Sequence, residues 1–386
     1  MSATSETSHN IIVNEVRRFV DKEVIPVASE LEHRNEFPQH LMDQVRDMGI
    51  LGMVISPQYG GLGLPLTTYA SVVEELSRGW MSLGGIINTH VIDGYIIENF
   101  GTEEQKKRWL PALAEGEKRG ALCVTEPNAG SDVQAIETTA TRDGDFYRLN
   151  GTKMFVSNGR RAQFYMVLCK TNKNASPITA GMSAIFVEKG TDGLRINRDI
   201  DKLGYKGLDT VELDFTDSPV PVTHLVGGKE GAGMKQVLSG LEVGRINVGA
   251  RAVGLARAAF DDAIQYSFQR HSFGKPIFEH QAIHMMLADM ATKIEAAHHL
   301  VQSAAEKKQR GERSDLETGM AKLFASEVCQ EIVVDAMRVF GGYGYTKEMR
   351  VERYYRDAPM LIVGEGTSQI QKIVIARALE RKYKRA

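Results

Sequence analysis

The spacing of apolar residues changes twice along this chain of 386 residues, and each change marks a different kind of secondary structure. From Ile11 to about Gly120 the apolar residues recur at helical spacing, in segments separated by short glycine or proline breaks. From Ala121 to Val222 the apolar runs are short and strand-like, and from Met234 onward the helical spacing returns in longer segments. The sequence therefore predicts an α+β protein whose helical, β and helical parts follow one another.

We place three domains at these changes, because a chain of this length exceeds what one hydrophobic core usually holds. They are an N-terminal helical domain over residues 1–120, a small β-barrel or β-sandwich domain over residues 121–232, and a C-terminal four-helix bundle over residues 233–386. Asp143-Gly144 and Asn150-Gly151 predict two-residue hairpin turns in the β domain. The expected bundle helices run from Met234 to about Gln269, from about Glu279 to Lys308, from a capping box at Ser314 to Val339, and onward from Thr367.

The composition is that of a soluble globular protein, with 42% hydrophobic residues, 25% charged residues and a formal net charge of −2. Without a basic excess or a Lys/Arg-rich helix, we expect neither a nucleic-acid partner nor a membrane surface as partner. Three cysteines are too few for a disulfide framework, and the polar segment from Met1 to Asn10 lacks the features of a targeting peptide. No HExxH or CxxC motif indicates a metal site. A cytoplasmic protein is the expectation.

One stretch, Val363 to Gln371, combines glycines, a carboxylate and the start of a helix. In it Glu365 lies between two glycines, and Thr367 or Ser368 is a good N-cap for the helix that follows. Apolar residues with the 3, 4 spacing of a buried helical face come next, namely Ile370, Ile373, Val374 and Ala378. An acidic residue at such a position can simply stabilise the helix start, by ~0.3–1 kcal/mol. It can also act as a base toward a bound carbon acid, with a nearby N–H stabilising the oxyanion.

Four further loops combine small residues with hydroxyl, amide or basic side chains: Cys123–Asp132, Phe155–Gly159, Arg270–Lys275 and Phe340–Tyr345. Each is a weak signal alone, because ordinary turns and helix ends use the same residue types. The chain has no P-loop motif, no GxGxxG unit between a strand and a helix, and no GxSxG elbow. Nucleotide-binding sites of those kinds and a hydrolase site are therefore not indicated.

Together, and in this order, the four loops and the segment Glu365–Thr367 resemble the acyl-CoA dehydrogenase family over nearly the whole chain. The resemblance implies an enzyme that holds FAD and introduces a Cα–Cβ double bond into an acyl-CoA thioester. Glu365 would take the Cα proton, flavin N5 would accept the Cβ hydride, and the electrons would pass to an electron-transfer flavoprotein. The Cα–H is a weak acid, so the enolate-like charge needs donors at the carbonyl oxygen. Exclusion of water by the substrate would raise the pKa of the glutamate toward a useful value.

The resemblance also assigns binding residues by position, with FAD lying between the β domain and the bundle. The positions matched to cofactor binding are Thr125, Ser131, Phe155, Ser157, Arg270, Phe273, Gln281, Arg338, Gly342 and Thr367. The positions matched to substrate binding are Ser131, Leu241, Arg245 and Gly366. Arg270 and Phe273 would reach the FAD of a neighbouring subunit, where the guanidinium would pair with the pyrophosphate. This implies an obligate dimer and a homotetramer built as a dimer of dimers.

The chain departs from the family pattern at several positions. Many members have Trp where this chain has Phe155, and Gln is usual where Arg338 stands. The family's alternative position for the base is occupied by Gly244, which cannot act as one. Glu242 lies two residues upstream and is expected on another face of its helix. Glu365 therefore keeps the role of base in this interpretation.

A last departure concerns the acyl group. Gly364 stands where many straight-chain members carry Tyr, and the missing ring predicts space beside Cα and Cβ for a short or branched acyl group. Ile92, Tyr95 and Ile96 are expected to limit the depth of the pocket. Relatives on the same fold can instead act as acyl-CoA oxidases or enoyl-CoA reductases, and a non-catalytic helical scaffold is the alternative from another class.

Overall fold

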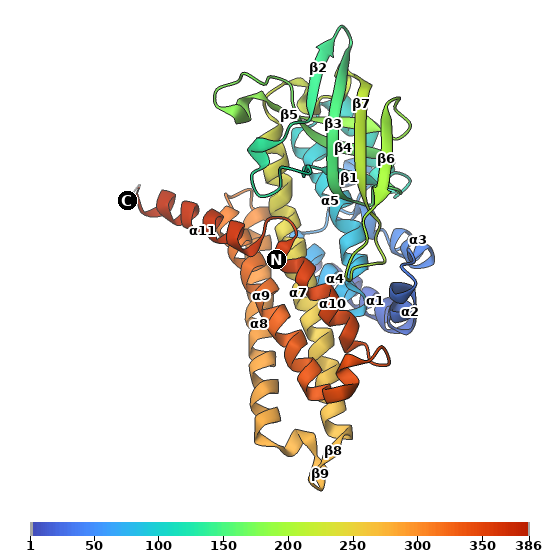
Figure 1. Ribbon diagram of the computed structural model, residues 1–386, viewed down its shortest axis with the longest axis vertical. Helices are drawn as coiled ribbons and strands as arrows, with labels where there is room; N and C mark the ends of the chain where they lie inside the picture. The colour runs from blue at the N-terminus through green and yellow to red at the C-terminus, as the bar shows by residue number, and fades with distance from the viewer. Residues whose placement is uncertain (1–2, 385–386) are drawn as a thin grey trace.

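The computed structural model describes residues 3–384, and it has the helical, β and helical parts that the sequence predicts (Figure 1). The β domain lies at one end of an elongated molecule, and a small hairpin at the tip of the C-terminal helices lies at the other (Figure 1). The expectation for the segment Met1–Asn10 falls partly outside the described residues. Within them, no helix is both long enough and apolar enough to cross a membrane.

The N-terminal part packs its helices around one that is buried on nearly every side. The helices are α1 Ala3–Phe19, α2 Ile25–His33, α3 Gln39–Asp47, α4 Leu66–Gly79, α5 Met81–Phe100 and α6 Glu103–Ala114. In α4 the apolar stripe of Tyr69, Val72, Val73 and Leu76, which has helical spacing, is fully buried. α5 is apolar all round and buried over most of its length, as expected for a helix at the centre of a molecule.

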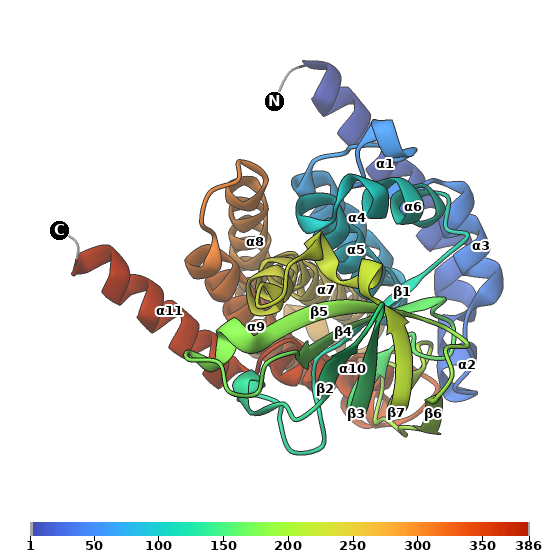
Figure 2. The same cartoon turned by 90° about the horizontal axis from the view of Figure 1, so that it is seen from above.

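The β domain is a single curled sheet of seven strands that fan out beside α7 (Figure 2). The strands are β1 Gly120–Cys123, β2 Thr139–Asp143, β3 Phe146–Ser157, β4 Phe164–Lys170, β5 Met182–Glu188, β6 Leu194–Asp199 and β7 Thr210–Pro221. Their order is β1-β4-β2-β3-β7-β6, with β5 paired to β4. The long strands β3 and β7 form the middle of the sheet, so the loops at their ends are held by many ladder hydrogen bonds.

The two predicted hairpin turns have different outcomes. β2 and β3 do form a hairpin at Asp143-Gly144, where Asp143 pairs with Phe146 and Gly144 has a φ of 59°. The prediction of a turn at Asn150-Gly151 is wrong, because β3 continues through these residues and only its register with β7 shifts there. Gly151 is required for close packing: a Cβ on it would lie 2.4 Å from Oγ1 of Thr138. The dipeptide marks a β-bulge rather than a chain reversal.

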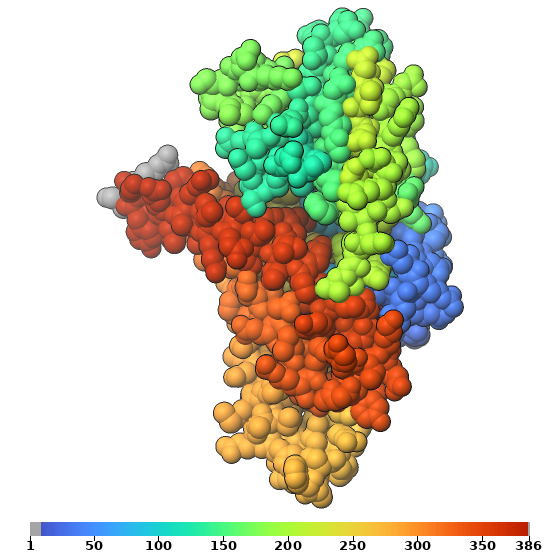
Figure 3. All heavy atoms as spheres, viewed as in Figure 1, coloured from blue at the N-terminus to red at the C-terminus, as the bar shows by residue number. Residues whose placement is uncertain are grey.

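The C-terminal part contains five helices where the sequence pattern predicts four. They are α7 Gly233–Gln269, α8 Gln281–Gln309, α9 Asp315–Phe340, α10 Val351–Val363 and α11 Ser368–Tyr383. The unpredicted α10 packs against α7 and α9, so it is the fourth helix of the bundle. The helix after Thr367, α11, packs mainly on α9 and projects from the side of the molecule (Figure 3). Ile373, on its predicted buried face, is 45% exposed.

Helix starts show how local signals compete with tertiary contacts. The side chain of Thr367 caps α11 by accepting from the N–H of Ile370, as predicted. Ser314 does not form the predicted capping box of α9. Its hydroxyl donates instead to Glu242 on α7 at 3.0 Å, and Glu317 accepts from Lys307 on α8 at 2.6 Å. The side chains of the box therefore tie α9 to its neighbours in the bundle.

Candidate active site

Glu365 lies in the turn between α10 and α11, with its backbone in the left-handed region at a φ of 53°. This conformation costs a non-glycine residue on the order of 1–2 kcal/mol, so surrounding contacts must hold it. Nε2 of Gln371 donates to the carbonyl oxygens of Glu365 at 3.1 Å and of Gly366 at 3.0 Å. Nζ of the buried Lys322 donates to the Gly366 carbonyl at 3.0 Å. The turn is thus fastened from both α11 and α9.

The carboxylate of Glu365 points inward, and its side chain is 17% exposed. Oε1 accepts a hydrogen bond from the amide of Asn88 on α5 and lies 3.7 Å from Nη2 of Arg251 on α7. Oε2 has no hydrogen-bond partner among the described residues. Burial raises the pKa of Glu365, although Arg251, Asn88 and Lys322 act against the rise. A buried carboxyl with a raised pKa and a free oxygen is suited to accept a proton.

Gly244 on α7 makes room for this carboxylate. A Cβ at position 244 would lie 1.9 Å from Oε2 of Glu365 and 2.8 Å from Cδ1 of Ile92. Glu242, the nearby alternative, turns toward α8, where its carboxylate accepts from Nζ of Lys308 at 2.7 Å. The structure therefore brings one acidic residue, Glu365, to the point that Gly244 leaves open.

Three of the four expected substrate-binding residues, Leu241, Arg245 and Gly366, lie near the same point, and Ser131 lies on the β domain. Leu241 is half-buried on α7, about one turn before Gly244, and Gly366 follows Glu365 directly. Arg245 is buried on α7 at 7% exposure, and burial lowers the pKa of its guanidinium. The space predicted beside Gly364 is partly filled, because a Cβ there would lie 3.1 Å from Sδ of Met360.

Several polar residues near Glu365 are not indicated by the sequence motifs. Arg251 is 1% exposed, and its Nη1 donates to the hydroxyl of Tyr205 at 2.8 Å. Asn247, one turn earlier on α7, donates to the hydroxyl of Tyr69 at 2.7 Å. The available signal was a single arginine inside the run of small and apolar residues from Val248 to Leu255, all of which are buried. Charged residues are almost never fully buried unless they are paired, so an arginine within such a run indicates a partner for its charge.

A second group of predicted residues lies on the β domain. Thr125 follows β1 and is half-buried, Ser131 is exposed in the same loop, and Ser157 ends β3 opposite Thr210. Phe155 has a φ of 57° and lies where the register between β3 and β7 shifts. Its ring is consequently turned outward, and the residue is 59% exposed. An exposed aromatic ring beside hydroxyl groups is a surface that fits a flat polar ligand.

Buried polar contacts fasten this surface. Glu126 in the loop after β1 pairs at 2.8 Å with Nζ of Lys153, which is fully buried on β3. The same carboxylate accepts from the backbone N–H of Thr138 at 3.0 Å. Asn158, next to Ser157, donates to the Ile86 carbonyl of α5 at 2.8 Å. The loops that carry Thr125 and Ser157 are therefore fixed to each other and to the central helix.

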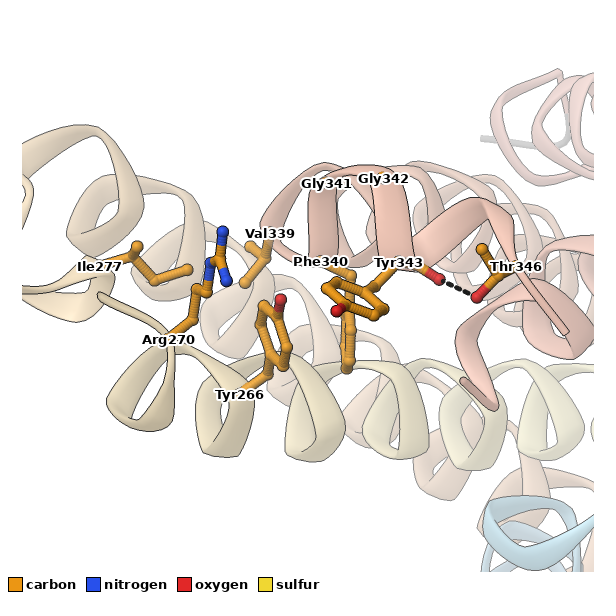
Figure 4. Close-up of a pocket in the computed structure, with 9 residues that line it drawn as sticks. All are labelled: Tyr266, Arg270, Ile277, Val339, Phe340, Gly341, Gly342, Tyr343 and Thr346. Carbon is orange, nitrogen blue, oxygen red and sulfur yellow. Dashed lines mark hydrogen bonds between the residues drawn. The ribbon is translucent and has the colours of Figure 1, made fainter. Parts of the chain in front are cut away.

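A third group lies at the far end of the bundle, around a cavity of about 450 Å³ (Figure 4). Arg270 and Gly342 line this cavity together with the stacked rings of Tyr266 and Phe340, whose centroids are 4.3 Å apart. Phe273, at the tip of the β8–β9 hairpin (His271–Ser272 and Lys275–Pro276), is 96% exposed. Two more predicted residues are exposed here: Gln281 begins α8, and Arg338 pairs with Asp335 at 2.7 Å.

The elements that carry the two groups lie apart, because the sheet with β1 and β3 is toward one end of the molecule and the β8–β9 hairpin is at the other (Figure 1). The structure brings Glu365, Thr367, Arg245 and Gly366 together, and it separates the residues on the β domain from those around Arg270.

Comparison with known proteins assigns the whole chain to one family. Three family models match in order: acyl-CoA dehydrogenase N-terminal domain over residues 6–117, middle domain over residues 121–218, and C-terminal domain over residues 231–380. An acyl-CoA dehydrogenase of Bacillus subtilis is 41% identical, covering 94% of this chain and 96% of the relative. The acryloyl-CoA reductase (NADH) of Anaerotignum propionicum is 41% identical, covering 95% of this chain and 93% of the relative.

The fold agrees with the sequence matches. The structure of butyryl-CoA dehydrogenase from Megasphaera elsdenii superposes with a TM-score of 0.93 at 38% identity, covering 96% of this chain and 97% of that one. Matches of this extent account for nearly the whole chain. This chain belongs to the acyl-CoA dehydrogenase family.

Proposed function

We propose that this protein is an FAD-dependent acyl-CoA dehydrogenase in which Glu365 removes the Cα proton of the thioester. The observation that carries the proposal is the carboxylate of Glu365, which is held in a strained turn with Oε2 unpartnered and with its pKa raised by burial. Backbone strain of this kind collects at functional sites. Membership of a family of FAD-dependent enzymes supports the cofactor.

The residues of this chain fit FAD in their chemistry. Arg270 offers a guanidinium for a pyrophosphate, and beside it Gly341 and Gly342 would meet no atom within 4 Å if they carried a Cβ. On the β domain, Phe155 offers an exposed ring, and Thr125 and Ser157 offer hydroxyls for a flat heteroaromatic group. When bound, FAD supplies an acceptor for the hydride that leaves Cβ.

The protein's part in the reaction is to hold and move a proton. Glu365 accepts the Cα proton at Oε2, and closure of the site by the thioester removes water and raises the pKa of Glu365 further. Its own backbone N–H donates to the thioester carbonyl oxygen, where negative charge develops. This N–H makes no hydrogen bond to another described residue, which supports the assignment.

The separation of the two cofactor-binding groups supports an assembly in which FAD bridges subunits. In such a dimer the Arg270 group of one chain completes the site on the β domain of its partner. A homotetramer, as a dimer of dimers, remains the proposed assembly, and an electron-transfer flavoprotein remains the proposed electron acceptor.

The second candidate is the same chemistry run in reverse, as an enoyl-CoA reductase. The 41% identical acryloyl-CoA reductase (NADH) favours it. An acyl-CoA oxidase is the remaining alternative on this fold. Oxygen consumption with acyl-CoA would identify an oxidase, and NADH-dependent loss of an enoyl-CoA in the presence of an electron-transfer flavoprotein would identify a reductase.

The test of the proposed base is anaerobic bleaching of the flavin by acyl-CoA. Glu365→Gln should keep FAD and bind acyl-CoA, but flavin reduction should slow by ~10²–10⁴-fold or more, because the proton acceptor is gone. Glu242→Gln is the matched control, since its carboxylate faces Lys308 and should leave the rate within a few-fold. Near-normal reduction in Glu365→Gln together with loss in Glu242→Gln would refute the assignment.

A further inference from the structure

Behind the carboxylate of Glu365 lies a buried polar cluster that the dehydrogenation step does not use. We define the Arg251 cluster as Tyr69, Asn88, Tyr205, Asn247 and Arg251. These residues come from α4, α5, the segment before β7, and α7, and each is at most 5% exposed. An aliphatic acyl chain at this place would contact the hydrogen-bond donors and acceptors of these side chains. Polar groups that lose water without gaining a partner weaken binding, so such a wall disfavours a hydrocarbon tail.

The fold makes specific room for this cluster. Two successive glycines of α5 face it: a Cβ on Gly84 would lie 2.9 Å from Cγ of Arg251, and a Cβ on Gly85 would lie 1.5 Å from the hydroxyl oxygen of Tyr205. Glycine inside a helix costs about 1 kcal/mol relative to alanine. The sequence therefore accepts two unfavourable helix residues where Arg251 and Tyr205 enter the core.

The guanidinium of Arg251 has unused hydrogen-bonding capacity. It carries five N–H donors, yet among the described residues it makes one hydrogen bond, to Tyr205, and its Nε has no partner. Its one carboxylate neighbour, Glu365, lies at 3.7 Å from Nη2, which is an ion pair without a hydrogen bond. Oδ1 of Asn88 is also without a partner within residues 3–384. The open N–H donors of Arg251 are the groups here that can serve an acceptor on a bound ligand.

The charge balance points to an anion. Arg245, Arg251 and Lys322 are all buried and all act on the charge of Glu365. In the described part of the chain, neither Arg245 nor Lys322 has a carboxylate within 4 Å, and the charges of Glu242, Asp315 and Glu327 reach them only from farther away. Glu365 is therefore the one carboxylate of the described residues that lies within 4 Å of any of the three cations. A buried charge is costly unless it is paired. When Glu365 takes up a proton from the substrate, even this partner becomes neutral.

We infer that the substrate is the CoA thioester of a short dicarboxylic acid, whose distal carboxylate binds Arg251. This inference rests on the proposed function. A guanidinium and a carboxylate form paired, charge-assisted hydrogen bonds, and the open donors of Arg251 provide them. Tyr205 and Asn88 flank the same position. The carboxylate of the substrate accepts from the N–H groups of Arg251 that Glu365 leaves unused, while Oε2 of Glu365 faces Cα.

The distances set the length of the acyl group. A base acts at about 3 Å from the atom that it deprotonates, and the two oxygens of a carboxylate lie about 2 Å apart, so Cα at Oε2 lies within roughly 9 Å of Nη2 of Arg251 by way of Oε1 of Glu365. Allowing about 3 Å for the hydrogen bond to the guanidinium, roughly 6 Å at most remains for the chain from Cα to a carboxylate oxygen. At ~1.3 Å of advance per carbon–carbon bond, this fits a chain of about four or five carbons. Longer acyl groups would have to displace Tyr205.

The experiment compares pairs of thioesters of equal length with the FAD-loaded enzyme and an artificial electron acceptor. Succinyl-CoA is paired with butyryl-CoA, and glutaryl-CoA with pentanoyl-CoA. We expect kcat/KM for one dicarboxylyl thioester to exceed that of its partner by at least about 100-fold, because a site built around a polar group rejects an analogue that lacks it. Higher kcat/KM for both monocarboxylic thioesters would overturn the inference while leaving the proposed dehydrogenase function intact.

The variant Arg251→Met tests whether Arg251 causes the preference for the dicarboxylyl thioester. It should lower kcat/KM for the dicarboxylyl thioester by about 100-fold more than for the monocarboxylic partner, with the difference mainly in KM. Arg257→Gln is the matched control on the same helix, because Arg257 pairs with Glu74 at 3.3 Å and not with Glu365. An equal loss for both thioesters in Arg251→Met would show that Arg251 only positions Glu365, and would overturn the inference.

Calorimetry keeps the inference testable if no thioester reduces the flavin, an outcome that would refute the proposed function itself. The holoenzyme should then still bind the dicarboxylyl thioester at least about 100-fold more tightly than its partner. Arg251→Met should abolish that difference. Equal affinities in the unsubstituted protein would overturn the inference in this case also.

Discussion

At the scale of single residues, the carboxyl of Glu365 sits where burial works against its ionised form. The three nearby cations reduce this effect without cancelling it, so the pKa of Glu365 is raised above the ordinary value of 4.5. A group of this kind binds a proton more readily in the folded chain than in the unfolded one. Between the two pKa values the folded state therefore holds more protons, and the free energy of unfolding falls as the pH rises.

The fall of the free energy of unfolding with rising pH leads to a stability prediction for Glu365→Gln. The neutral amide avoids the cost of ionisation, so the variant should unfold at a higher temperature than the parent at pH 7.5. The gain should shrink toward zero near pH 4, where the carboxyl is protonated in both states. Thermal unfolding followed by circular dichroism at both pH values measures it. A parent protein that is the more stable at pH 7.5 would contradict the assigned sign.

At the scale of elements, the loop after β1 depends on one buried ion pair. Burial opposes ionisation of Glu126, but Lys153 and the backbone N–H groups of Glu137 and Thr138 hold its pKa below the ordinary value. Lys153 in turn donates to the Val124 carbonyl at 3.0 Å. The loop that carries Thr125 therefore keeps its shape through charges with almost no access to water.

Lys153→Met should destabilise the protein by about 3–5 kcal/mol, because it leaves a buried carboxylate unpaired. The deficit should be smaller at pH 5 than at pH 8, since Glu126 can then neutralise itself by taking up a proton. FAD content should fall together with stability. Urea unfolding and the flavin-to-protein absorbance ratio measure the two effects.

The double variant Lys153→Met with Glu126→Gln provides the control for this pair. With both charges gone, it should recover at least half of the lost stability. No recovery would mean that Lys153 acts through its packing and not through its charge.

Elements also show how far the sequence specifies this fold. Helix periodicity predicts α4, α7, α8 and α9, because each buries a long apolar stripe that local spacing reveals. It does not predict α10, whose charged residues and internal Pro359 hide a buried face of Val351, Tyr354, Ala358 and Leu361. The Asn150-Gly151 signal fails for a related reason. Contact with Thr138, and not local turn preference, decides the conformation there.

Some residues of the candidate site can likewise be predicted from local sequence, and others only from tertiary packing. The glycines around Glu365 and the cap at Thr367 are neighbours in sequence, so local reasoning finds them. Asn88 is 277 positions away from Glu365, and only the packing of α5 brings its amide to the carboxylate. Arg251 leaves a trace in the sequence as an arginine among apolar residues, but its partners Tyr205 and Glu365 come from other parts of the chain.

At the scale of the whole molecule, the proposed FAD site is one that only two chains together complete. Arg270→Ala should therefore lower FAD affinity and weaken assembly together, because one guanidinium serves the cofactor of the partner subunit. Sedimentation velocity and flavin absorbance after gel filtration measure the two effects. Arg108→Ala is the control, since Arg108 is exposed and pairs with Glu188 beside the β domain. A monomer that retains full FAD at low protein concentration would contradict the shared site.

The empty position on α7 has a consequence for how this catalytic machinery can change over time. A side chain at residue 244 would begin less than 2 Å from the place where the carboxylate of Glu365 ends. Two segments more than a hundred positions apart in sequence, α7 at Gly244 and the turn at Glu365, can thus each place a side chain at the same point. A lineage can transfer the acid from one segment to the other by two substitutions, with the backbone left in place. At this site the fold specifies where the acid lies, and the segment that supplies it can differ.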